Sequence, residues 1–246
     1  MREWAGTRYW LIGASEGLGR SLAFAMSRVG CRLVLSARND DRLAALAEEL
    51  PGPAEIKAVD VGDRAAVEAA AAEIGEIDGM VYLAGVYWPI DAKEWNTENA
   101  EAMCEINMMG GIRAVGAVLP AMLERGSGHI VLTGSLSGFR GLPGAVGYGA
   151  SKAGLMSLAE TMRFDLRGTG VDVQLANPGF IRTRLTDKNE FTMPFIMEPE
   201  DAARDMMDLM SSDRFSKSYP AVFAAFFRLS QFMPNWLYYR LFANSS

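Results

Sequence analysis

A tyrosine and a lysine four residues apart offer proton chemistry. Tyr148 and Lys152 bracket the segment YGASK, and residues at positions i and i+4 lie on one face of a helix, one turn apart. A free tyrosine titrates at pH ~10, but a neighbouring ammonium favours the phenolate and lowers that pKa. Such a tyrosine could give a proton to a carbonyl or take one from an alcohol. By itself the spacing is uninformative, because it occurs by chance on many helices.

A glycine-rich loop follows the first apolar run of the chain. Gly13, Gly17 and Gly19 come directly after the apolar residues 9–12. Glycine permits a tight turn and a close approach of the backbone to a phosphate. The free N–H groups and the dipole at a helix start favour an anionic pyrophosphate. A strand-to-helix turn without any ligand explains the three glycines equally well.

The elements that must position these residues alternate along the chain. The expected strands cover residues 9–12, 31–37, 54–60, 129–135 and 171–179, and residues 78–86 are expected to form a strand and its turn. The expected helices cover 18–29, 40–50, 63–74, 97–125 and 147–166. Pro120 would bend or shorten the longest helix. This alternation predicts an α/β fold, a doubly wound parallel sheet with helices on both faces. The unusual motifs fall at the carboxyl ends of the strands, where such sheets bind ligands.

Composition limits the class of protein. The 246 residues, half of them hydrophobic, fit a single domain spanning 1–246, and the net charge of −6 argues against a nucleic-acid binder. Cys31 and Cys104 form no C-x-x-C pair, and clustered His or Cys ligands for a metal are missing. The only histidine, His129, begins an expected strand and is predicted to be structural. We therefore expect a cytoplasmic protein with no disulfide and no metal.

In combination these motifs resemble the short-chain dehydrogenase/reductase family over residues 8–185. The loop spacing G-x-x-x-G-x-G and the pair Tyr148/Lys152 carry the resemblance, and Ser135 lies 13 residues before the tyrosine, as in that family. The resemblance implies a Rossmann-like fold and hydride transfer between a nicotinamide cofactor and a carbonyl or alcohol. It implies that Ser135 binds the substrate oxygen, Tyr148 transfers the proton and Lys152 also holds the nicotinamide ribose. Asn107 would hold a water that links the lysine to solvent, unless it is a plain polar position on a buried helix.

The resemblance also implies cofactor contacts at several strand ends. These contacts are Gly13, Ser15, Glu16, Gly17, Leu18, Gly19, Arg38, Asn39, Asp60, Val61, Ala84, Gly85, Tyr148, Lys152, Pro178, Gly179, Ile181 and Thr183. Asp60 and Val61 would touch the adenine, although Asp60 could equally be a turn residue. The segment from Pro178 to Thr183 would hold the nicotinamide carboxamide.

The sequence departs from the family pattern at two places. Ile12 stands where the family often has threonine, and Tyr82-Leu83 replaces the usual Asn-Asn before Ala84-Gly85. Those amides normally help to tie the central sheet, so other groups must satisfy the backbone there. The departure puts local geometry in doubt more than the reaction.

Arg38 bears on the choice of cofactor. A carboxylate at the end of the second strand would accept hydrogen bonds from the adenosine ribose 2′-OH and favour NAD(H), whereas an arginine can pair with a 2′-phosphate. Asp40 and Asp41 follow, but they suit the cap and first turn of the next helix. We predict NADP(H) over NAD(H), with an ordinary surface arginine as the alternative.

Two later segments are rich in apolar residues. Residues 182–200 fall where the family places its substrate lid, and Met193, Phe195, Ile196 and Met197 suit either an apolar substrate or core packing. Residues 219–246 are predicted to form a short hydrophobic C-terminal helical extension. Its two amphipathic helices could cover the substrate mouth or form a subunit contact, with a membrane-surface patch as the weaker alternative.

The sequence therefore predicts an NADP(H)-dependent oxidoreductase acting on a ketone, an aldehyde or a secondary alcohol of apolar character. Two alternatives are an epimerase or dehydratase of the same fold and a catalytically silent NADP(H)-binding sensor or scaffold. The resemblance implies a homodimer or homotetramer through the two long helices, where Gly149, Ala150, Ala153 and Gly154 would permit close packing.

Overall fold

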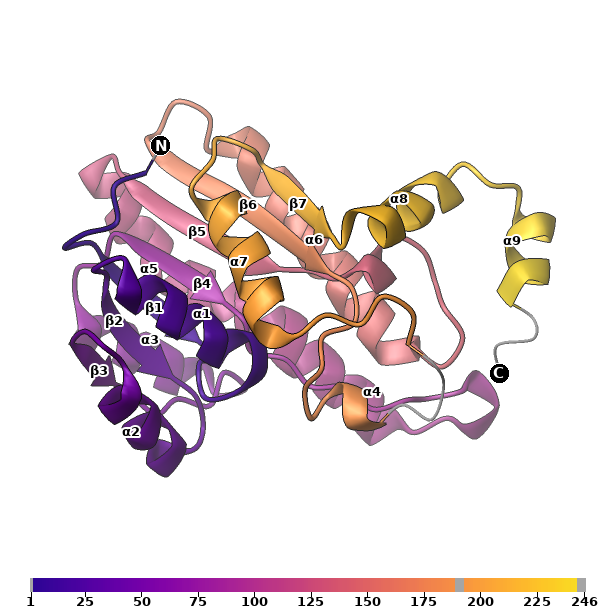
Figure 1. The fold of residues 1–246 in the computed structure, drawn as a ribbon, viewed down its shortest axis with the longest axis horizontal. Coiled ribbons are helices and arrows are strands. Elements are labelled where there is room, and N and C mark those ends of the chain that lie inside the picture. Colours follow the sequence, from indigo (N-terminus) through magenta and orange to yellow (C-terminus); the bar gives the residue numbers. More distant parts are fainter. Residues whose placement is uncertain (1, 189–192, 243–246) are drawn as a thin grey trace.

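The computed structural model describes residues 2–188 and 193–242, in which seven parallel strands form one sheet (Figure 1). The strand order is β3-β2-β1-β4-β5-β6-β7. The strands are β1 (Arg8–Ile12), β2 (Arg32–Ser36), β3 (Ala54–Ile56), β4 (Gly79–Tyr82), β5 (Gly128–Thr133), β6 (Val171–Pro178) and β7 (Ser216–Tyr219). The chain starts at the centre of the sheet, builds outward to β3, and then returns beside β1 with β4. This order confirms the predicted doubly wound fold.

Helices cover both faces of the sheet. They are α1 (Gly17–Arg28), α2 (Asp40–Glu49), α3 (Arg64–Ile74), α4 (Thr97–Cys104), α5 (Gly110–Arg125), α6 (Val146–Asp165), α7 (Pro199–Met210), α8 (Ala221–Ser230) and α9 (Asn235–Phe242). Successive strand residues point to opposite faces. Tyr9 and Leu11 of β1 therefore pack with α1, α2 and α7, whereas Trp10 and Ile12 pack with α3, α5 and α6.

Local signals placed most of these elements within one or two residues. Asn39 caps α2 by accepting a hydrogen bond from Arg42 N, and Asp63 caps α3 by accepting one from Ala66 N. The third strand is the main boundary error, because its ladder ends at Ile56 and not at residue 60. Beyond it, two backbone bonds still join the segment to the end of β2 and the residue after it: Lys57 N donates to Leu35 O at 2.9 Å and Val59 N to Ala37 O at 3.0 Å.

The long helix predicted at 97–125 is continuous but not uniform. A π-helical turn, Glu105–Met109, joins α4 to α5, and Pro120 lies inside α5 without ending it. By length and composition this is the one helix in the described parts of the chain that could cross a membrane. Its face with Ala114, Val118 and Met122 is buried against the sheet, so it is a core helix.

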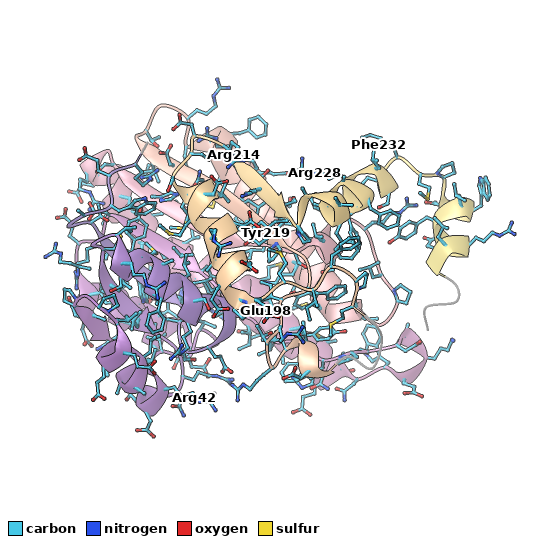
Figure 2. The ribbon with its side chains drawn as sticks, viewed as in Figure 1. Arg42, Glu198, Arg214, Tyr219, Arg228 and Phe232 are labelled. Atoms are coloured by element: carbon cyan, nitrogen blue, oxygen red, sulfur yellow. The ribbon has the colours of Figure 1, made fainter. Side chains whose placement is uncertain are left out.

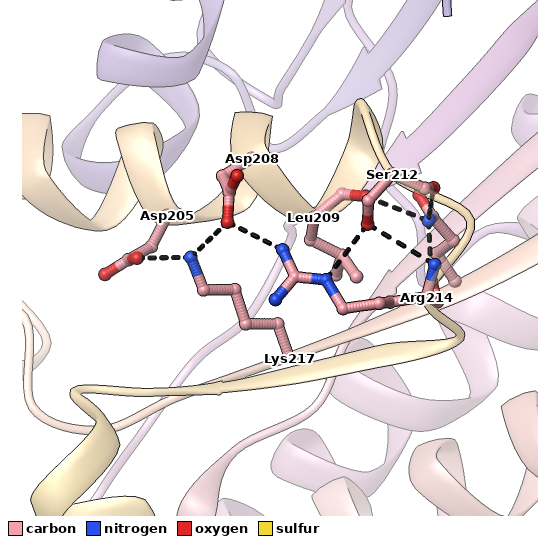
Figure 3. A network of polar contacts seen from close by, with 7 residues as sticks. Asp205, Asp208, Leu209, Ser212, Arg214 and Lys217 are labelled. Carbon is pink, nitrogen blue, oxygen red and sulfur yellow. Dashed lines mark hydrogen bonds and ion pairs between the residues drawn. The ribbon is translucent and has the colours of Figure 1, made fainter. Parts of the chain in front are cut away.

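The edge strand β7 and the helix α7 were not predicted. The strand sequence SKSY has a single apolar residue, so it lacks a strand pattern. Figure 3 shows how ion pairs hold it: Lys217 Nζ lies 2.5 Å from Asp205 Oδ1 and 2.7 Å from Asp208 Oδ2, and Arg214 donates to Asp208 at 2.7 Å. The strand is fixed by polar contacts with α7 that only the folded chain brings together.

His129 lies in the core and has no exposed atom to offer a ligand. Gln174 Nε2 donates to the carbonyl of Leu209 at 2.9 Å, so its Oε1 faces the imidazole and accepts from His129 Nε2 at 2.9 Å. His129 Nδ1 then accepts from the Tyr9 hydroxyl at 2.8 Å. Burial lowers the pKa of His129 to about 3, so the ring stays neutral and ties β1 to β5 and β6.

Candidate functional site

The glycine loop closes tightly between three strand ends. Gly13 has φ +97°, and a Cβ at this position would lie 2.5 Å from Ala84 N. A Cβ on Gly19 would overlap the carbonyl oxygen of Gly13. Gly13 N donates to Ser36 O at 2.7 Å. The loop therefore packs backbone against backbone at the carboxyl ends of β1, β2 and β4, and any larger residue would close the space.

The start of α1 suits an anionic ligand. Among the described residues no side chain caps this helix, whose N-cap residue is Glu16, whereas Asn39 and Asp63 cap α2 and α3. The leading N–H groups of α1 are thus available for a phosphate, as at other helix starts that bind nucleotides. Ser15 precedes the helix, and Leu18 packs partly into the core beneath it. The residues present fit the pyrophosphate of a dinucleotide.

The segment after β6 returns to the glycine loop. A Cβ on Gly17 would lie 2.7 Å from Thr183 Cγ2, and Glu16 forms ion pairs with Arg184 and, at 3.0 Å, with Arg42. The predicted pyrophosphate loop and the predicted carboxamide segment are therefore neighbours. Glu16, Arg42 and Arg184 were not predicted to pair, because they come from three distant parts of the chain.

The residues expected around the adenosine lie at the neighbouring strand ends. Arg38 follows β2 and is exposed. Asn39 begins α2: its Oδ1 accepts from Arg42 N at 2.8 Å and its carbonyl oxygen accepts from Leu43 N at 3.3 Å. Asp60 Oδ1 accepts from Gly62 N at 2.9 Å, so Asp60 does shape a turn, and Val61 is buried beside Gly110.

The segment from Pro178 to Thr183 is held from two sides. Gly179 N donates to Tyr219 O at 2.7 Å, and Ile181 forms a parallel bridge with Met197. Part of the expected lid, residues 189–192, lies outside the described residues. In the part described, Phe195 packs on Phe223 of α8 with ring centroids 5.6 Å apart, so the lid segment and the C-terminal extension are in contact.

Tyr82 stands where the family usually has an asparagine, and its hydroxyl forms a hydrogen bond in this region of the structure. It is fully buried, and its hydroxyl donates to Ile106 O at 2.5 Å, inside the π-helical turn. A Cβ on Gly110 would collide with that hydroxyl, so the glycine makes room for it. Leu83 N donates to Ile12 O at 2.8 Å. In place of the two asparagine amides, a tyrosine hydroxyl joins β4 to the π-helical turn, and a backbone hydrogen bond joins the end of β4 to β1.

Replacing Tyr82 with phenylalanine is expected to lower the free energy of unfolding by about 1 kcal/mol, because it removes the part-buried hydrogen bond to the Ile106 carbonyl. Urea unfolding of the purified variant measures this cost. Tyr239→Phe is the matched control, since Tyr239 is 65% exposed and should lose almost nothing. An equal stability for both variants would show that the Tyr82 hydroxyl does not hold the turn.

Ser135, Tyr148 and Lys152 meet at the carboxyl end of β5. Ser135 lies two residues after the end of β5 and is buried, and its Oγ lies 3.0 Å from the hydroxyl of Ser137. Lys152 Nζ lies 5.7 Å from the centre of the Tyr148 ring and donates to Thr133 O at 2.8 Å. The predicted catalytic residues on α6 therefore face the strand end that carries the serine.

Burial, and not Lys152, dominates the titration of Tyr148. Desolvation raises the pKa of Tyr148 to about 12, although a hydrogen bond with Ser135 opposes the rise. Burial also lowers the pKa of Lys152 to about 8. In the protein alone, burial therefore raises the tyrosine pKa, and the lowering expected from the lysine does not dominate. Tyr148 keeps its proton at neutral pH, which suits a group that donates to an oxygen.

Asn107 is a tether in the π-helical turn. Its side chain is buried, accepts from Val86 N at 2.7 Å, and donates to Val86 O and Ser151 Oγ, both at 3.0 Å. A Cβ on Gly85 would lie 3.4 Å from Asn107 Oδ1 and 3.8 Å from Lys152 Nζ. Asn107 therefore binds the segment after β4 to α6 right beside the lysine, a more specific role than a plain polar position.

Tyr87 was not singled out by the sequence. Its ring meets that of Tyr148 edge to face, with centroids 5.1 Å apart. Lys188 donates to Tyr87 O at 2.7 Å and lies 4.5 Å from the centre of the Trp88 ring. The two aromatic residues that follow Ala84-Gly85-Val86 were the available signal, because residues after a strand end can face the site.

Known proteins share this architecture. A family model described as short chain dehydrogenase matches residues 9–193. An uncharacterized oxidoreductase of Myxococcus xanthus is 39% identical over 237 residues, which are 93% of this chain and 93% of that protein. A short chain dehydrogenase/reductase from Burkholderia phymatum in complex with NAD has a TM-score of 0.86 at 26% identity, over 93% of this chain and 94% of that one. A short-chain dehydrogenase from Sphingobium yanoikuyae in complex with NADPH has a TM-score of 0.82 at 28% identity, over 91% and 92%.

Proposed function

Because the chain belongs to the short-chain dehydrogenase/reductase family and is an NAD(P)-dependent oxidoreductase, we propose that it transfers a hydride between NADP(H) and a ketone, an aldehyde or a secondary alcohol of apolar character. The observation that carries the proposal is the meeting of Ser135, Tyr148 and Lys152 at the sheet edge that also holds the uncapped start of α1.

The protein's own groups manage the substrate oxygen and its proton. When bound, the nicotinamide supplies or accepts the hydride. Ser135 Oγ and the Tyr148 hydroxyl bind the substrate oxygen and stabilise the negative charge that develops on it. Tyr148 then donates its proton to that oxygen in the reductive direction. Lys152, anchored by Thr133 O, holds a positive charge beside the tyrosine and stabilises the phenolate that remains.

Charge supports NADP(H) as the cofactor. Arg38 is exposed at the end of β2, and it forms no ion pair with any carboxylate in the described parts of the chain. Arg42 and Arg184 converge nearby on Glu16. A 2′-phosphate at this edge could pair with the Arg38 guanidinium, which no carboxylate of the described residues competes for. The described end of β2 carries no carboxylate that could accept hydrogen bonds from the 2′-OH of NAD(H).

Arg38→Ala is expected to lower kcat/KM for NADPH by about tenfold or more and to leave that for NADH nearly unchanged, because a hydrogen bond to a charged group contributes about 1.5–3 kcal/mol. Steady-state kinetics with both cofactors measures the effect. Arg32→Ala, at an exposed arginine of the same strand, is the control. A parallel loss with both cofactors, or a wild-type protein that prefers NADH, would contradict the assignment.

Aromatic side chains support an apolar substrate. Tyr87 lies against Tyr148, and Phe180 and Phe195 both pack on Phe223 of α8, with centroids 5.8 and 5.6 Å apart. These rings gather beside the segment that begins at Gly179, where a Cβ would lie 3.2 Å from Phe223. Such a wall favours substrates with an apolar body.

An oligomer through α5 and α6 is part of the proposal. Ala150 and Ala153 are exposed on α6, and Ile112 of α5 is 39% exposed. Gly149 and Gly154 also lie against other parts of their own subunit. Gly149 is buried, and a Cβ on Gly154 would collide with the Met108 side chain, so both glycines accommodate contacts inside the subunit.

A further inference from the structure

The C-terminal extension exposes a continuous set of large apolar side chains. On α8, Val222, Phe226 and Leu229 recur at helical spacing and are 71%, 40% and 68% exposed, while Ala224 and Phe227 face inward and are buried. Phe232, in the turn after α8, is 87% exposed, and Figure 2 shows it at the outer rim of the molecule. So much exposed apolar surface in one segment marks an interaction site.

The second helix continues this surface. Trp236, Tyr239 and Leu241 of α9 are 68%, 65% and 52% exposed. Figure 1 shows α9 standing away from the sheet, beyond the outer end of α8. We call the exposed side chains of Val222, Phe226, Leu229, Phe232, Trp236 and Tyr239 the extension surface.

The extension carries the opposite charge to the rest of the protein. Residues 219–246 contain Arg228 and Arg240 and no aspartate or glutamate, so their formal charge is +2, while the other residues carry −8. Arg228 makes no ion pair with a described residue, and its guanidinium lies over the Phe139 ring at 5.7 Å and donates to Ser218 Oγ at 3.4 Å. The extension surface is thus apolar, bordered by unneutralised positive charge.

Polar contacts hold the extension in a defined position. Arg140 stacks on the Tyr238 ring at 3.8 Å and donates to Met233 O at 2.9 Å and to Asn235 Oδ1 at 2.8 Å. The Tyr238 hydroxyl donates to Gly141 O at 2.7 Å. These bonds fix the side of α9 that carries Tyr238 to the loop around Arg140 and Gly141. The opposite side of α9, with Trp236 and Tyr239, therefore faces solvent.

We propose that the extension surface binds the face of a lipid bilayer that carries anionic headgroups. Amphipathic helices with aromatic and aliphatic residues on one face and arginines beside them lie in the plane of such an interface. Tryptophan and tyrosine are enriched at the level of the lipid headgroups. A second copy of the chain fits less well. In a two-fold contact the surface would meet itself, and Arg228 and Arg240 would face only like charge.

Vesicle flotation with the full-length protein tests this proposal. We expect the protein to float with phosphatidylcholine vesicles that contain phosphatidylserine, and to partition onto them about thirty-fold more strongly than onto pure phosphatidylcholine, because each arginine near an anionic surface contributes about fivefold. Added salt should weaken the binding by screening these charges. Recovery only in the soluble fraction with both kinds of vesicle would overturn the proposal.

Paired variants locate the surface. Phe232→Ser combined with Trp236→Ser is expected to abolish flotation, while Phe164→Ser, at a 72% exposed phenylalanine near the end of α6, should leave it unchanged. NADPH binding and thermal melting, unaltered in all of them, would show that each variant is folded. If light scattering instead shows that the double variant breaks an oligomer while wild-type protein ignores both vesicles, the surface is a contact between copies and the lipid proposal is wrong.

Discussion

Tyr148→Phe is expected to lower kcat by about a thousandfold or more, because it removes the proton that is transferred to the substrate oxygen. The ring stays, so its packing against Tyr87 and the fold should persist. Steady-state turnover with NADPH and a ketone measures the loss, and fluorescence titration should give an unchanged Kd for NADPH.

Tyr87→Phe is the matched control for this prediction. It removes a hydroxyl from the neighbouring ring and preserves the edge-to-face contact with Tyr148. This variant should retain most of the wild-type kcat. Loss of a general acid lowers the rate by about a hundredfold to ten-thousandfold. If Tyr148→Phe kept turnover within about tenfold of wild type, Tyr148 would not be the proton donor.

Gly13→Ala is expected to cost about 3 kcal/mol or more of unfolding free energy, since an L-residue at positive φ costs 1–2 kcal/mol and overpacking adds about as much again. The added Cβ would press on the backbone of Ala84 at 2.5 Å. Affinity for NADPH should fall as well, because the loop and β4 would have to separate. Urea unfolding and cofactor titration measure the two effects, and failure to recover folded protein would agree with the larger cost.

Gly168→Ala separates backbone strain from collision. Gly168 has φ +79°, but a Cβ there meets nothing within 4 Å. Its replacement should cost only about 1–2 kcal/mol, the backbone part alone. Equal losses for Gly13→Ala and Gly168→Ala would mean that the contact between the loop and β4 is not tight.

Local patterns were enough to predict the sheet's centre and the position of its motifs. Apolar runs, the caps Asn39 and Asp63 and the glycine loop each act over a few residues, so the sequence displays them directly. Because parallel strands end at one edge, the motifs at those ends had to be neighbours. The resemblance to the short-chain dehydrogenase/reductase family added the expectation that Ser135 acts together with Tyr148 and Lys152.

Features that depend on distant parts of the chain could not be predicted. The polar strand β7 exists because Lys217 reaches two aspartates of α7. The pKa of Tyr148 depends on its burial among residues from several elements, and this outweighs the lysine four positions away. The hydrogen bond from the Tyr82 hydroxyl to Ile106 O in the π-helical turn likewise joins residues 24 positions apart, so no local sequence pattern predicts it.

The most direct test of the proposed chemistry is the kcat/KM of the wild-type protein for ketones and aldehydes of increasing apolar size, measured with NADPH and with NADH. The site predicts oxidation of NADPH that becomes more efficient as the apolar body of the substrate grows, with NADH a poorer cofactor throughout. Tight NADPH binding without turnover of any carbonyl, or a consistent preference for NADH or for small polar substrates, would contradict it.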